Sequence, residues 1–158
     1  MNDAPAVIRA YLVVVDDSPE SRLAMRYAAL RAVHVGARVT LLHVLAAPEF
    51  MQWGGVQELI EAEATAAAEA LLAGVADELV ALTGQRPSVI VRQGEATVAI
   101  MEIVTADPSI HALVLGAAPR GAPGPLVDFF AGERAGQLPC LVMIVPGGLS
   151  AERLADLT

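Results

Sequence analysis

The segment YLVVVDDSPESRLAMRYAALRA, residues 11–32, carries the signals of a buried strand followed by an α-helix. The apolar run over about Arg9–Val15 is continuous, as in strands that are buried on both faces of a parallel sheet. Ser18 is a suitable helix N-cap, Pro19 suits the first helical position, and Gly36 provides a helix C-terminus. The segment therefore predicts one β–α unit.

The same alternation of strand and helix patterns continues along the rest of the chain. Further strands are predicted at about 38–44, 88–92, 111–115 and 140–145, and further helices at about 56–82, 97–106 and 126–137. Five strands alternating with helices predict an α/β fold, a doubly wound parallel sheet with helices on both faces. No internal repeat or linker interrupts the pattern. We therefore expect one domain over residues 1–158, with a core of about 8–147 and a tail, 148–158, that is a helical turn or disordered.

Composition and charge argue against several classes of function. Apolar residues make up 55% of the 158 residues and aromatic residues only 4%, so small and aliphatic side chains build the core. The net charge of −8 argues against nucleic acid or an anionic membrane as the main partner. All 10 basic residues are arginines, so a P-loop lysine, a Schiff-base lysine and a receiver-domain lysine are excluded. The single cysteine, Cys140, cannot form an internal disulfide, and no signal peptide or membrane-length apolar run is visible. We therefore expect a cytoplasmic protein.

Four segments give the chain a resemblance to the universal stress protein family. They are YLVVVDDSPESRLAMRYAALRA (11–32), GARVTLLHV (36–44), RQGEATVAIMEIV (92–104) and the end of the chain, ALVLG (112–116) with AGERAGQLPCLVMIVP (131–146). These segments occur in the order that the family has. The resemblance implies a strand order of 3-2-1-4-5 and a homodimer joined mainly through the last strand, Cys140–Val145.

The glycine-rich segment Gly116–Glu133, GAAPRGAPGPLVDFFAGE, lies where α/β proteins often bind phosphates. The ATP-binding branch of the family has Gly, two residues, Gly, nine residues, Gly, and then Ser or Thr. Counting from Gly116 puts the second glycine on Pro119, which has no N–H, and the last two positions on Phe129 and Phe130.

Counting backwards from Gly132 fits no better. This register puts the first two glycines on Pro119 and Ala122 and the hydroxyl residue on Glu133, whose carboxylate would repel phosphate. Gly121 and Gly124 replace the missing glycines of the ATP-binding pattern only in part. The loop therefore predicts a modified cleft rim that disfavours ATP, and a plain turn or a partner surface is the alternative interpretation.

The candidate residues of the cleft come from this loop and from the ends of the first two strands. They are Asp16, Asp17, Val44, Gly116, Gly121, Gly124, Gly132 and Glu133. A structural alternative exists for the aspartates, which can cap the following helix and hold the turn. We expect His43 to be a hydrogen-bonded core histidine, and Phe50, Met51 and Trp53 to form either a cluster under the long helix or a lid.

These observations favour a non-catalytic, dimeric stress-response protein that acts through protein contacts or a small ligand. No pair of nucleophile and general base, no G-x-S-x-G segment and no metal-ligand spacing is visible, so no catalytic or metal-binding residue is assigned. The alternative is a universal stress protein that binds ATP with Mg²⁺ and hydrolyses it slowly or not at all. No cofactor is expected in the first case.

Overall fold

The computed structural model describes residues 7–47 and 54–158, and its elements alternate between strand and helix. Phe50, Met51 and Trp53 lie outside the described residues. The elements are β1 (Ala10–Val14), α1 (Pro19–Val35), β2 (Arg38–Leu45), α2 (Gly54–Thr83), β3 (Ser88–Gln93), α3 (Ala96–Ala106), β4 (Ile110–Ala117), α4 (Pro125–Phe130), a 3-10 turn η1 (Ala135–Gln137), β5 (Leu141–Pro146) and α5 (Ala151–Asp156).

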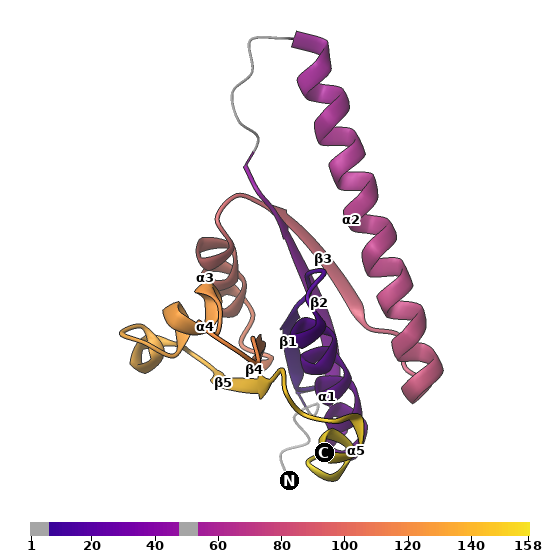
Figure 1. Cartoon of the computed structure of the whole chain (residues 1–158), viewed down its shortest axis with the longest axis vertical. Helices are drawn as coiled ribbons and strands as arrows, with labels where there is room; N and C mark the ends of the chain where they lie inside the picture. Colours follow the sequence, from indigo (N-terminus) through magenta and orange to yellow (C-terminus); the bar gives the residue numbers. More distant parts are fainter. Residues whose placement is uncertain (1–6, 48–53) are drawn as a thin grey trace, which may run out of the picture.

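The five strands form one parallel sheet in the order β3-β2-β1-β4-β5 (Figure 1), which confirms the predicted fold class and strand order. The chain first builds outward from β1 to β2 and β3, then crosses back to place β4 on the other side of β1. The chain therefore leaves the carboxyl ends of β1 and β4 in opposite directions, toward β2 on one side and β5 on the other. In open α/β sheets this switch point is where ligands bind.

Alternating strand residues build two separate cores, one on each face of the sheet. Val13, Leu41 and Val114 face α1, α2 and α5, whereas Leu12, Leu42 and Leu113 face α3 and α4. The face of α1 that meets the sheet consists largely of small side chains, namely Ala24, Ala28, Ala29 and Ala32. Small side chains let a helix approach the strands closely.

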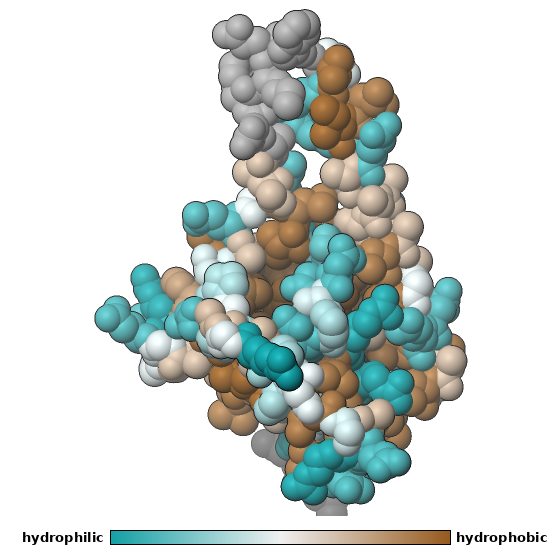
Figure 2. Space-filling view, in the orientation of Figure 1, coloured by the Kyte–Doolittle hydropathy of each residue, from teal (hydrophilic) through white to brown (hydrophobic). Residues whose placement is uncertain are grey.

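Helix α2 (Gly54–Thr83) extends well beyond the sheet (Figure 1), and residues 55–67 in its N-terminal half are exposed or half-buried. Val56, Leu59 and Ile60 on this half are exposed, and Figure 2 shows hydrophobic side chains there. Acidic residues accompany them: Glu58, Glu63 and Glu69 are exposed, as expected for a solvated helix face, and Glu61 is partly exposed. None of the residues of α2 is basic.

Near the C-terminus, the segment 126–137 differs from the prediction, and the tail takes one of the two forms that the sequence allowed. The helix expected over 126–137 is instead α4, a turn and η1, because Gly132 and Gly136 weaken helix formation after Phe130. The tail forms α5, which Ser150 caps by accepting a hydrogen bond from the backbone N–H of Arg153 at 3.1 Å. Within the described ranges no helix is both long and apolar enough to cross a bilayer.

Candidate functional site

A cavity of about 470 Å³ opens at the carboxyl ends of β1 and β4, beside the starts of α1, α3 and α4. Its apolar wall consists of Val14, Val15, Val44, Leu115, Leu126 and Val127. Its polar side chains are Asp16, Ser18, Glu20, Ser21, His43, Glu95 and Thr97. The volume is that of a site for a small organic ligand, and the position is the switch point of the sheet. We call this cavity the cleft.

A chain of hydrogen bonds holds the β1–α1 turn on one side of the cleft. The Asp16 carboxylate accepts from the backbone N–H of Ser18 at 2.7 Å, and the Ser18 Oγ accepts from the N–H of Ser21 at 3.2 Å. The buried Ser21 hydroxyl accepts from the N–H of Asp16 at 3.0 Å and donates to the carbonyl of Val14 at 3.2 Å. Asp16 therefore holds the turn, and Ser18 is the helix cap that the sequence predicts.

His43 lies at the edge of the cleft with one ring nitrogen already engaged. Its Nδ1 is 2.7 Å from the carbonyl oxygen of Val15. A carbonyl oxygen only accepts, so Nδ1 carries the proton, and in the neutral ring Nε2 is left as an acceptor. The expected hydrogen bond is present, but His43 is half-buried and lines the cleft rather than lying within the core.

Gly116 serves helix packing at the end of β4. A Cβ at this position would overlap the carbonyl group of Glu20 and would lie 2.9 Å from the backbone nitrogen of Ser21. Only glycine lets the first turn of α1 approach the strand this closely.

The loop after Gly116 is closed by a hydrogen bond between its two ends. The N–H of Ala118 donates to the carbonyl of Pro123 at 3.0 Å, and Gly121 and Gly124 have φ values of 72° and 122°, which favour glycine. Pro119, Pro123 and Pro125 have no N–H to donate. The loop is therefore a poor cradle for phosphate oxygens.

Four of the eight residues that the sequence suggested for the cleft line it: Asp16, Val44, Gly116 and Gly124. Asp17, Gly121, Gly132 and Glu133 are exposed and are not among the residues that line it. Sequence reasoning did not assign Glu95 and Thr97, at the start of α3, to the cleft. Their only signal was their place in the segment 92–104, one of the four that resemble the family.

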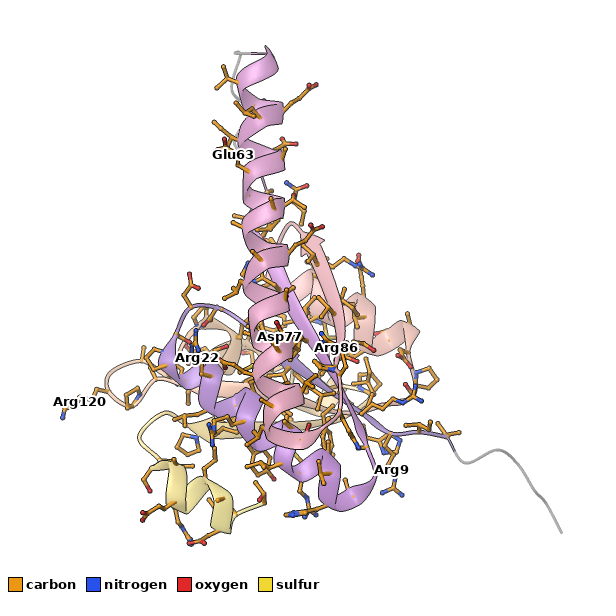
Figure 3. All side chains as sticks on the ribbon, turned by 90° about the vertical axis from the view of Figure 1, so that its right-hand side faces the viewer. Arg9, Arg22, Glu63, Asp77, Arg86 and Arg120 are labelled. Carbon is orange, nitrogen blue, oxygen red and sulfur yellow. The ribbon has the colours of Figure 1, made fainter. Side chains whose placement is uncertain are left out.

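Among the described residues, every charged side chain that lines the cleft is a carboxylate: Asp16, Glu20 and Glu95. Arg120 and Arg134, which lie within and just after the glycine-rich segment Gly116–Glu133, point elsewhere. Arg120 projects from its loop away from the sheet (Figure 3), and Arg134 donates to Gln137 at 3.3 Å and lies 5.8 Å from the centre of the Phe129 ring. The cleft is thus acidic. No group of three or more metal-ligating side chains occurs among residues 7–47 and 54–158.

Cys140 lies apart from the cleft, just before β5, and is half-buried. Burial raises the pKa of the Cys140 thiol, and a backbone hydrogen bond with Leu113 opposes this effect only in part. A thiol that is held neutral is a poor nucleophile.

A family model described as "Universal stress protein family" matches residues 8–146. Among solved structures, the universal stress protein UspA from Lactobacillus plantarum is 18% identical, with a TM-score of 0.71 and coverage of 87% of this chain and 97% of that chain. A universal stress protein in complex with cAMP is 16% identical, with a TM-score of 0.62 and coverage of 89% and 98%. An Arabidopsis thaliana protein of the same family with AMP bound is 16% identical, with a TM-score of 0.60 and coverage of 92% and 94%. No curated protein matches the chain.

Proposed function

Because this chain belongs to the universal stress protein family, we propose that it is a non-catalytic, homodimeric stress-response protein whose cleft binds a small ligand of the adenine nucleoside and nucleotide class. The main support for ligand binding is the cleft at the switch point of the sheet. Two structural neighbours bind ligands of this class, cAMP in one and AMP in the other.

The hydroxyl groups and the histidine of the cleft support a role without catalysis. The Ser21 hydroxyl both donates to and accepts from the main chain. The Nδ1 of His43 is also hydrogen-bonded to the main chain. Among the described residues, His43 makes no hydrogen bond to the hydroxyl of Ser18, Ser21 or Thr97. A nucleophile needs a neighbouring base within hydrogen-bond reach, and this arrangement does not supply one.

The alternative, a protein that binds ATP with Mg²⁺, has less support from the cleft. A triphosphate would lie near three carboxylates, and two like charges 4 Å apart repel by about 4 kcal/mol at an effective dielectric constant near 20. Mg²⁺ could bridge carboxylates and phosphates. The loop nevertheless lacks an N–H group at three positions, Pro119, Pro123 and Pro125.

The exposed edge of β5 supports the homodimer. Leu141 and Ile144 on this strand are 68% and 40% exposed. An apolar groove continues from β5 over Tyr27, Leu149 and Leu157. An uncovered apolar edge strand promotes aggregation, and pairing with a second β5 would cover it.

Two measurements test the proposal. Nucleotide analysis after acid release, followed by calorimetry with AMP, cAMP and Mg·ATP, should show binding of AMP or cAMP and weaker binding of Mg·ATP. Stoichiometric ATP in the purified protein, or a Kd for Mg·ATP below about 10 µM, would favour the alternative. Sedimentation should show a dimer at micromolar concentration, and a monomer there would contradict the proposed assembly.

A further inference from the structure

We propose that the cleft selects its ligand by charge and accepts an uncharged, donor-rich nucleoside in preference to the corresponding phosphate ester. This inference rests on the proposed function, since it specifies the ligand of the same cleft. Its basis is the charge and the hydrogen-bonding capacity of the described side chains that line the cavity.

The side chains of the lining are mainly hydrogen-bond acceptors. The carboxylates of Asp16, Glu20 and Glu95 only accept when ionised, and the Nε2 of His43 accepts when Nδ1 carries the only ring proton. Within the described part of the chain, neither Glu20 nor Glu95 forms an ion pair, and no hydrogen bond occupies either carboxylate. Both groups are therefore available to a ligand that carries donors, such as the amino and hydroxyl groups of a nucleoside.

The donors that face the cleft are few. The hydroxyl proton of Ser21 is directed to the carbonyl of Val14, which leaves the hydroxyls of Ser18 and Thr97 as side-chain donors. The first residues of α3 (Ala96 and Thr97) and of α4 (Leu126 and Val127) also line the cleft, and a helix leaves its first N–H groups without an internal partner. A fully ionised phosphate group has only acceptor oxygens, and it would meet these donors beside three carboxylates.

The helix termini do not compensate for the carboxylates. The N-termini of α1, α3 and α4 meet at the cleft, and each carries up to about half a positive charge. Three carboxylates outweigh this positive charge. Glu95 also occupies the N-cap position of α3 without making a side-chain cap bond, so its charge lies at the helix end that would otherwise attract an anion.

The test compares adenosine with AMP by calorimetry at one pH, for the wild type and for the double variant Glu20→Gln/Glu95→Gln. Glutamine keeps the shape and an acceptor oxygen but removes both charges. We expect the wild type to bind adenosine about tenfold or more tightly than AMP, because the phosphate of AMP would be repelled by the carboxylates of the cleft whereas adenosine carries no charge. In the variant, the preference should fall to about threefold or less, mainly through tighter AMP binding.

A matched control removes two carboxylates outside the cleft. Glu102 and Glu152 are exposed and do not line the cavity, so Glu102→Gln/Glu152→Gln changes the net charge equally and should keep the wild-type preference. Raising the KCl concentration from 50 to 500 mM should also reduce the preference in the wild type, because salt screens exposed charges.

The outcomes separate this inference from the function on which it rests. Equal or tighter binding of AMP by the wild type, or an unchanged preference in Glu20→Gln/Glu95→Gln, would overturn charge selection and leave the nucleotide-class ligand in place. Absence of binding of both compounds to both proteins would overturn the ligand class itself, and the inference with it.

Discussion

Gly116, at the end of β4, lies so close to the main chain of Glu20 that a Cβ at position 116 would overlap the Glu20 carbonyl group. The glycine that most suggests a phosphate loop is thus required by the contact between β4 and the first turn of α1. This contact also brings Glu20 to the rim of the cleft. The close contact between α1 and β4 therefore matters both for packing and for the ligand selection that we propose.

Replacing this glycine should destabilise the protein. We expect Gly116→Ala to lower the free energy of unfolding by about 1–3 kcal/mol, because the methyl group forces α1 away from β4. Gly74→Ala is the matched control: it lies within α2 with open space around it, and alanine there should stabilise by about 0.5–1 kcal/mol. Urea unfolding of both variants measures the difference. A Gly116→Ala protein as stable as the wild type would contradict the close approach.

The β1–α1 turn should depend on a single hydroxyl group. Ser21→Ala removes the side chain that accepts from Asp16 N–H and donates to the Val14 carbonyl, and it leaves these groups short of partners in a buried place. We expect a loss of about 1–3 kcal/mol in the free energy of unfolding. Ser88→Ala, at an exposed serine with no hydrogen bond to its side chain among the described residues, should change stability by less than about 0.5 kcal/mol. Similar losses in both variants would show that the turn does not rely on Ser21.

The sequence predicts this turn well because its signals are local. Ser18 caps α1, Pro19 follows it, and Gly36 adopts a left-handed conformation at the helix end, with φ of 68°. Each signal acts within a few residues of its effect, so neighbouring residues alone suffice to locate the elements. The strand order was available only through the resemblance to the family.

The rim of the cleft is harder to predict because it depends on contacts between distant segments. Glu133 follows α4 in the sequence, yet the turn after Phe130 leaves it exposed and outside the cleft. Glu95 reaches the cleft only because the sheet order brings the start of α3 near β1 and β4. Counting residues along the glycine loop cannot reveal either placement.

The projecting half of α2 should tolerate truncation of its apolar side chains. Leu59 is 59% exposed, and we expect Leu59→Ala to change the free energy of unfolding by less than about 0.5 kcal/mol. Leu72, on the same helix, is fully buried against the sheet, and Leu72→Ala should cost about 2–5 kcal/mol. Chemical denaturation of the two variants provides the comparison. A large loss for Leu59→Ala would show that another surface covers this half of the helix in solution.

The proposed dimer predicts that a charge on β5 will separate the two copies. We expect Ile144→Arg to convert the dimer to a monomer in sedimentation velocity, because the arginine would be buried in the apolar groove beside Tyr27 and Leu157. Val33→Arg introduces the same charge at a similarly exposed position on α1 and should leave the dimer intact. A dimer that persists in Ile144→Arg would place the interface elsewhere.

The half-buried thiol of Cys140 should make stability depend on pH in the alkaline range. Burial raises the thiol pKa in the folded protein, so the unfolded chain loses this proton at a lower pH than the folded chain does. The contribution is therefore fully present below the ordinary thiol pKa of about 8.5 and is lost as the pH rises through the folded-state pKa. Urea unfolding at pH 7.5 and 9.5 measures how much stability each protein loses between the two pH values. The loss should be smaller for Cys140→Ala than for the wild type, because the two proteins share every titrating group except this thiol. An equal loss in the two proteins would mean that folding does not shift this thiol.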